Sequence, residues 1–472
     1  MPKKRTRPAN AAHTFAFVSV NDFGQVQQAA DRRLIRSHCM IGKNKRRTNL
    51  KAELSKHGSG RGSRAEYGEN GKEFQEPTPV RSLVAPPSDL LLVKFVKDID
   101  SQTRKLLFKY FVESNSLLYP RELGIDYERS RSSWFGWLSY DLGFFQSVLL
   151  SASAMVDYKT RKPFSNATHQ HLQKTIGLLN ERLSDDILVR SDATISIVLN
   201  LTRLADYSGD EEAKRTHIGG LQRLVHLRGG LDAFRSNNKM WIKLSRLDFG
   251  FCLDTRQHFE TEPAFWDPLF DYKKPFPSEN PIYGLIPELS GAKFVVDSRL
   301  ATVFRDLQYF SALLNTAVVR KQTISDRQFH EIVCSIQHRL MRLQGTLPDL
   351  LGECFRLGML AFLATLFQVP RTPCSYPYLE TRLKEACHSI ETTPDQWDLL
   401  LWLLMVGAMT VYKPEDPWLR DRWLSDVSPS TWPEVRGRLQ DIVWINALHD
   451  RPGRQVFDVM NMKKPDFFDL SG

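Results

Sequence analysis

The chain of 472 residues is 42% hydrophobic and 11% aromatic, which suffices for two or three average domains or one large helical domain with a substantial core. Its six cysteines show neither C-x-x-C spacing nor a short secreted framework, so we expect free, mostly buried thiols in a reducing compartment. No apolar core follows the charged N-terminus and no apolar run reaches the roughly 20 residues of a membrane span, which predicts a soluble intracellular protein without a secretory signal.

The net charge of +10 is concentrated at the N-terminus. Residues 1–65 hold fifteen Lys or Arg against three acidic residues, a net charge of +12, whereas the rest of the chain sums to −2. This distribution indicates an address signal or a polyanionic partner for the N-terminal segment rather than a charged core.

The first basic cluster consists of Lys3, Lys4, Arg5 and Arg7 between two prolines. Proline favours an extended, exposed backbone, the form in which a nuclear-import receptor binds such a cluster. Solvated charge without a role is the alternative. Import is the favoured interpretation because a second cluster follows.

The second basic cluster lies on a predicted helix at residues 25–47, where Val26, Ala30, Leu34 and Ile41 follow one side. A basic helix neutralises phosphates and can enter a major groove, but no heptad dimerisation helix follows it. A bipartite import signal is therefore favoured over sequence-specific DNA reading, and any nucleic-acid binding is expected to be weak or non-specific. The basic residues of this cluster are Arg32, Arg33, Arg36, Lys43, Lys45, Arg46 and Arg47.

The predicted fold class is all-α: a large multi-helix regulatory domain after a basic, partly disordered N-terminal arm. The arm covers residues 1–54, a Gly/Pro/Ser-rich linker 55–90, the helical domain 91–450 and a C-terminal tail 451–472. Predicted caps are Ser165, Ser325 with Gln328, Thr393 with Pro394, and Thr431 with Glu434. The expected helices include residues 134–155, 192–205, 217–228, 241–255, 298–320, 325–344, 352–367, 393–411 and 432–448.

An irregular segment interrupts this pattern at residues 262–291, where six prolines alternate with aromatic residues. A loop of this length is often functional or packed over a groove. The alternative, which we favour, is that its aromatic side chains complete the core.

A short helix and its glycine stop form the most distinctive stretch, HIGGLQRLVHLRGGLD from His217 to Asp232. Apolar residues at steps of three and four predict an amphipathic helix, and Gly229-Gly230 ends it. The stretch resembles the signature of the fungal-specific transcription-factor domain. The matching residues are His217, Leu221, Leu224, Arg228, Gly229, Gly230 and Leu231.

Other stretches are similar to the same family over roughly residues 90 to 450. They are Trp241–Thr255 with Asp248, Glu262-Pro263-Ala264-Phe265, the apolar run 399–404 with Gly407-Ala408, and Arg420-Asp421-Arg422-Trp423. Arg36, Ser37, His38 and Met40 also resemble an N-terminal motif of fungal proteins that carry this domain without a zinc cluster.

The resemblance implies an all-helical regulatory region that contacts other proteins, frequently as a homodimer, and in some members binds a small-molecule effector. The family usually places this region after a binuclear zinc cluster, which needs six closely spaced cysteines. Here Cys39 is the only cysteine before Cys252. Autonomous DNA binding through a zinc cluster is therefore not expected.

The sequence offers no catalytic residue, cofactor site or metal site. We find no G-x-S-x-G elbow, Walker loop, dinucleotide fingerprint or H-E-x-x-H motif. His38-Cys39 lacks a second ligand pair, and His169 and His171 are too close in sequence to share a helix face. Asp185-Asp186 is interpreted as helix-start charge.

The favoured hypothesis is a nuclear, fungal transcription-factor-like regulator that exchanges with the cytoplasm and is not an enzyme. Its expected partners are other proteins, either a second copy or a DNA-binding protein, with no membrane partner and no identified effector. The alternative is a helical protein-interaction scaffold with a basic arm and no transcriptional role. An enzyme within an all-helical fold is the third hypothesis, and it would require converging titratable side chains in a deep pocket.

Overall fold

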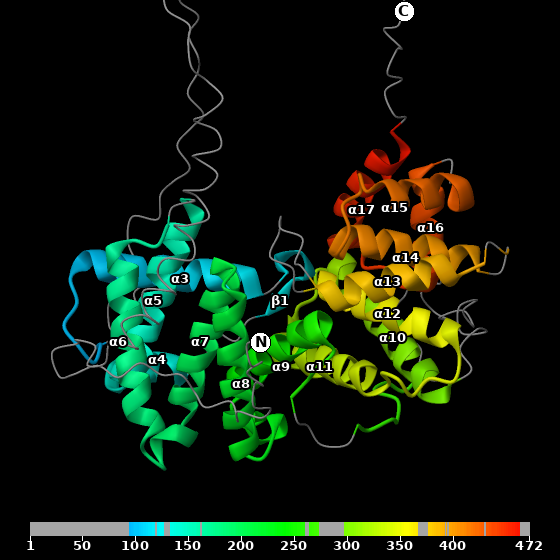
Figure 1. Ribbon diagram of the computed structural model, residues 1–472. Coiled ribbons are helices and arrows are strands. Elements are labelled where there is room, and N and C mark those ends of the chain that lie inside the picture. Colours follow the sequence, from blue (N-terminus) through cyan, green and yellow to red (C-terminus); the bar gives the residue numbers. More distant parts are fainter. Residues whose placement is uncertain are drawn as a thin grey trace, which may run out of the picture. The chain divides into compact units, whose positions relative to one another are not determined.

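The computed structural model describes residues 94–118, 120–126, 133–160, 163–259, 264–272, 297–366, 376–391, 393, 396–428 and 431–462. Within these ranges the regular structure is fifteen α-helices, short 3₁₀ and π-helical turns, and one parallel pair of two-residue strands (Figure 1). The predicted all-α fold class is confirmed. The N-terminal arm with both basic clusters, and the linker up to residue 90, lie outside the described residues.

The chain divides into two compact units, and the predicted single stretch 91–450 therefore contains both. Among the described residues, those up to 112 and from 133 to 227 belong to the first unit, and those from 113 to 126 and from 228 onwards belong to the second. The division at residues 227 and 228 falls directly after the signature helix and before Gly229-Gly230.

The first unit is a helical bundle in which α5 packs against α4, α6 and α7, and α7 packs against α8. Polar side chains on the buried helix α7 bond to their own backbone: Ser196 donates to the Asp192 carbonyl at 2.8 Å and Thr202 to the Val198 carbonyl at 2.9 Å. The elements are α3 (Ser101–Leu118, which continues into the second unit), α4 (Ser133–Tyr140), α5 (Leu142–Lys159), α6 (Asn166–Leu183), η2 (Leu188–Arg190), α7 (Asp192–Ser208) and α8 (Glu211–Leu227).

The second unit is built around α14, whose residues 399–408 are all buried. Helices α12, α13, α16 and α17 and the π-helical turn η6 pack against α14. The elements are η1 (Arg121–Leu123), β1 (Ile125–Asp126), η3 (Leu231–Phe234), α9 (Asn238–Thr255), α10 (Ser298–Arg320), β2 (Ile324–Ser325), α11 (Asp326–Arg342), α12 (Leu350–Thr365), α13 (Pro377–Ser389), α14 (Trp397–Thr410), α15 (Pro417–Arg422), η6 (Trp423–Val427), α16 (Trp432–Ile442) and α17 (Asn446–Asn461).

Local capping signals were accurate at three of the four predicted caps. Ser165, Ser325 and Thr431 each accept the backbone N–H of the residue three positions later. The fourth cap was misplaced, because α14 begins at Trp397 rather than at Thr393-Pro394.

Three further predicted boundaries were wrong. The expected helix 134–155 is broken between α4 and α5, where the Asp141 carboxylate accepts the Phe144 N–H and caps a new helix. The expected helix 432–448 is broken at residues 443–445. Residues 451–461, assigned to a C-terminal tail, continue α17 through Pro452, because Val456, Phe457 and Met460 are buried in the core.

The close packing of α12 on α14 depends on Gly358. A Cβ atom at this position would collide with the Trp402 ring and with Leu403 of α14. We therefore expect Gly358→Ala to lower the free energy of unfolding by about 1–3 kcal/mol, the usual cost of overpacking a core.

Urea unfolding followed by circular dichroism measures this effect, with Gly437→Ala of α16 as the matched control. A Cβ at Gly437 meets no atom within 4 Å, so that variant should gain about 0.5–1 kcal/mol of helix propensity. Equal stability changes in the two variants would show that Gly358 does not set the packing of α12 on α14.

Candidate functional site

The signature helix α8 buries the face that its sequence pattern predicts. Leu221 and Leu224 are buried together with Ile218 and Val225, and the helix packs against α7. Arg215, Arg223 and His226 are exposed and His217 is half-buried. The apolar spacing of the signature is therefore explained by packing within the first unit.

The two glycines of the signature adopt backbone conformations that other residues rarely take. Helix α8 ends at Leu227, and Gly229 follows with φ +95°. Gly230 has φ +90° and ψ −177°, a region populated almost only by glycine. Leu231 then begins η3 and is buried, while the Arg228 guanidinium lies 4.9 Å from the centre of the Phe234 ring. These matched residues therefore have local structural roles.

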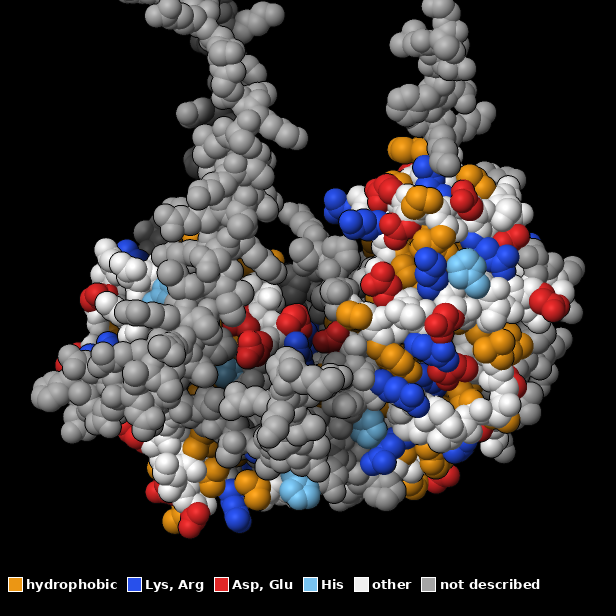
Figure 2. Space-filling model, viewed as in Figure 1, with side chains coloured by type: hydrophobic (Ala, Val, Ile, Leu, Met, Phe, Trp, Pro, Cys, Tyr) orange, Lys and Arg blue, Asp and Glu red, His pale blue; other side chains and the backbone are white. Residues whose placement is uncertain are grey.

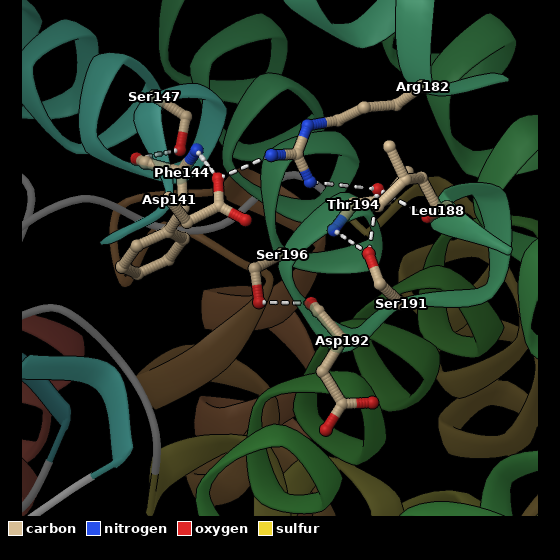
Figure 3. A network of polar contacts seen from close by, with 9 residues as sticks. All are labelled: Asp141, Phe144, Ser147, Arg182, Leu188, Ser191, Asp192, Thr194 and Ser196. Atoms are coloured by element: carbon tan, nitrogen blue, oxygen red, sulfur yellow. Dashed lines mark hydrogen bonds and ion pairs between the residues drawn. The ribbon is translucent and has the colours of Figure 1, made fainter. Parts of the chain in front are cut away.

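A polar network holds the helix junctions of the first unit together (Figure 3). The Arg182 guanidinium donates to Asp141 Oδ1 at 2.7 Å and to Thr194 Oγ1 at 3.4 Å. Thr194 in turn donates to the Leu188 carbonyl at 2.7 Å, and Ser191 caps α7 through the Thr194 N–H. A Cβ at Gly143 would lie 2.9 Å from Arg182 Nε, so glycine there admits the guanidinium. The network ties α5, α6 and α7 together.

His169 and His171, which are too close in sequence to share a helix face, contact separate partners. His169 Nδ1 lies 2.9 Å from the Ser165 carbonyl oxygen, whereas His171 Nδ1 lies 3.1 Å from Gln146 Oε1. The Asp185 carboxylate accepts the N–H groups of Ile187 and Leu188 at the start of η2.

Two buried carboxylates of the second unit, Asp306 and Asp248, accept hydrogen bonds from irregular backbone, a role that no sequence pattern predicts. Asp306 of α10 accepts Arg339 of α11 at 2.7 Å, the Tyr272 hydroxyl at 2.6 Å and the Leu269 N–H at 3.0 Å. Asp248 of α9 accepts the Phe259 N–H, and burial raises its pKa to about 7. No short sequence motif links Asp306 to Arg339, which lies 33 positions further along the chain.

The described part of the aromatic loop packs largely onto α10. Phe270 stacks on Tyr309 with ring centroids 4.6 Å apart, and the Arg299 guanidinium lies 5.5 Å from the Trp266 ring centre. Phe265 is 73% exposed. The core-completing interpretation is therefore supported for Trp266 and Phe270, while residues 273–291 lie outside the described part of the chain.

The described cysteines are free and buried, as expected. Burial raises the pKa of Cys252 and of Cys334 to about 12 and that of Cys354 to about 11, so the reactive thiolate form is disfavoured. Among the described residues no group of three or more His, Cys, Asp or Glu side chains could hold a metal ion. Cys39 and Cys374 lie outside these residues.

Buried histidines in the second unit are held neutral. Burial lowers the pKa of His330 and of His449 to about 3. His449 Nδ1 accepts the Ile445 N–H at 3.1 Å, so its proton is on Nε2, which donates to Thr365 Oγ1 at 2.8 Å. This arrangement gives His449 a structural role.

None of the described helices is long and apolar enough to span a membrane.

The chain matches no protein-family model, no curated protein and no solved structure in comparisons with known proteins. The resemblance to the fungal-specific transcription-factor domain therefore remains a prediction based on the residues quoted above. The import and phosphate-contact residues from Lys3 to Arg47 also remain predictions, because they lie outside the described residues.

The conformation of Gly230 makes the signature testable. Gly230→Ala should lower the free energy of unfolding by about 1–3 kcal/mol, because a Cβ is strained in this region of backbone space. Thermal unfolding measures the change. Gly219→Ala on α8 is the control: its Cβ would meet no atom within 4 Å, so it should be neutral or stabilising. A tolerated alanine at position 230 would contradict a structural requirement for glycine there.

Proposed function

We propose that the protein is a fungal transcription-factor-like regulator that acts in the nucleus through its helical region, without autonomous zinc-cluster DNA binding. The observation that carries this proposal is the signature at α8. Its matched leucines are buried and its matched Gly230 has a conformation reserved for glycine, so the pattern consists of residues with fixed physical roles.

A surface suited to protein contact supports a regulator that works through partners. Ile187 is 84% exposed, and Leu188 and Leu227 are also exposed. η2 lies between the end of α6 and the start of α7 and packs against α8, the helix that ends at Leu227. Contiguous exposed apolar side chains, such as the adjacent pair Ile187 and Leu188, are typical of interaction sites.

The same surface would also serve the alternative function, a helical interaction scaffold without a transcriptional role. The two hypotheses differ in where the protein acts and in what the basic arm does. Localisation and DNA binding therefore discriminate between them.

Nuclear import should depend on the first basic cluster. We expect the full-length protein to accumulate in the nucleus and the variant with Lys3, Lys4, Arg5 and Arg7 changed to Ala to lose most of that accumulation, because import receptors bind the exposed charges. Fluorescence microscopy of tagged protein measures the ratio of nuclear to cytoplasmic signal.

The matched control removes four basic residues outside both clusters, Lys51, Lys56, Arg61 and Arg64. It should remain nuclear although it loses the same charge. A cytoplasmic protein whose position ignores both sets of substitutions would favour the scaffold.

DNA binding should be weak and without sequence preference. We expect full-length protein selected on random duplex DNA to enrich no motif, and any binding to fall by about 10³-fold or more between roughly 50 and 200 mM salt if six or more phosphates are contacted. An enriched motif that disappears when residues 1–65 are removed would make the arm a sequence-specific reader and contradict the proposal.

A further inference from the structure

Two buried carboxylates hold the chain that leaves α9 and runs towards α10. Asp248 Oδ1 accepts the backbone N–H of Phe259, eleven positions later. Asp306 Oδ1 accepts the backbone N–H of Leu269, 37 positions earlier, and the hydroxyl of Tyr272. The two aspartates therefore perform the same task, which is to fix irregular backbone against a helix of the second unit.

The two anchors differ in how their negative charge is balanced. The second oxygen of Asp306 accepts the Arg339 guanidinium at 2.7 Å, and both side chains are almost fully buried. Asp248 is also fully buried, but its Oδ2 has no hydrogen-bond partner and no ion pair within the described residues. A buried carboxylate without a cation is strongly disfavoured in its charged form.

Among the described residues, no neighbour of Asp248 supplies the missing positive charge. Helices α11 and α13 and η3 pack against α9. The groups in electrostatic contact with Asp248 are two thiols, Cys252 on α9 and Cys334 on α11, both of which remain protonated because burial raises their pKa to about 12.

Charged groups on the surrounding elements act on other partners. Arg356 of α12 forms a bidentate pair with Glu353, and Tyr378 of α13 acts on Arg356. Arg246 of α9 acts on Cys334 and on His330 of α11. Asp232 of η3 and Arg235, which directly follows η3, pair with each other and act on His338 of α11.

We propose that Asp248 is a proton-dependent anchor of the chain that follows the C-terminal end of α9. In its neutral form it holds Phe259 against α9, and when it loses its proton this segment can open to water. Phe259 is itself buried in the protein interior, so opening would expose its ring together with the carboxylate. Asp306, whose charge Arg339 balances, provides a second anchor that holds Leu269 independently of this proton.

The direction of the pH dependence follows from the two states. In the closed state burial raises the Asp248 pKa to about 7, whereas a hydrated Asp has a pKa of 3.8. The closed state therefore binds the proton more tightly, and opening becomes easier as pH rises from about 4 to about 7. Above about pH 7 both states have lost the proton and the opening equilibrium no longer changes.

Amide hydrogen exchange of the full-length protein between about pH 5 and 8.5 tests the proposal. After correction for the intrinsic exchange rate, the protection of the Phe259 amide should fall about tenfold per pH unit up to about pH 7 and then level off. The Leu269 amide is the internal control and should keep constant protection. Asp248→Asn should abolish the dependence at Phe259, because an amide side chain still accepts the N–H but does not titrate.

The effect of His258 on Phe259 protection must be distinguished from that of Asp248, because the His258 ring Nδ1 lies 2.9 Å from the Phe259 carbonyl oxygen. His258→Gln should retain the pH dependence of Phe259 protection. Flat protection at Phe259 in the wild type would overturn the proposal, as would a dependence that survives in Asp248→Asn or is lost in His258→Gln. If Asp248→Asn does not fold, the wild-type comparison of Phe259 with Leu269 still decides.

Discussion

The constraint on which the second unit depends is that α14 is apolar on every side. Its residues 399–408 are all buried, so no face of this helix can meet water, and other helices must enclose it. Enclosure also requires a partner for the fully buried indole N–H of Trp402, which donates to the Val443 carbonyl at 3.2 Å. Residue 443 is where helical structure stops between α16 and α17. Gln308 and Asn315 of α10 bond the carbonyls of Ile442 and Trp444 on either side of it. The break between these helices is thus held by partners from α10 and α14.

A related rule holds at three buried carboxylates: where the chain enters or leaves a helix, the carboxylate accepts a backbone N–H that has no partner within the helix. Asp141 caps α5 while Arg182 balances its charge, and Asp306 fixes Leu269 while Arg339 balances its charge. Asp248 is the departure from this pattern, since it fixes Phe259 without a cation. A polar group that is only partly satisfied in a close-packed interior marks a place where the fold is held less firmly.

These long-range partners explain how much of the structure the sequence could predict. Apolar periodicity located most helices, and the caps at Ser165, Ser325 and Thr431 were recognisable because cap and helix are adjacent in sequence. The break at Asp141 was missed although Asp141 is adjacent to the helix it caps, because apolar and aromatic residues continue on both sides of it. The continuation of α17 through Pro452 was also missed, since burial of Val456 and Phe457 overrides a local signal that normally ends a helix. Of the candidate site, the sequence predicted the buried face of α8 and its glycine stop. It could not reveal the Asp306–Arg339 pair, which depends on two helices meeting.

The structural roles of the signature residues bear on where function would reside. Leu221, Leu224 and Gly230 are occupied by packing and backbone geometry, so they have no remaining group with which to select a partner. Under the proposed function, recognition of a partner protein would have to come from exposed side chains, such as Ile187 and Leu188 of the first unit. The +12 charge of residues 1–65 would supply only a long-range, salt-sensitive attraction to phosphates and an import signal. Because such attraction carries no sequence information, choice among genes would then depend on the protein that the helical units contact.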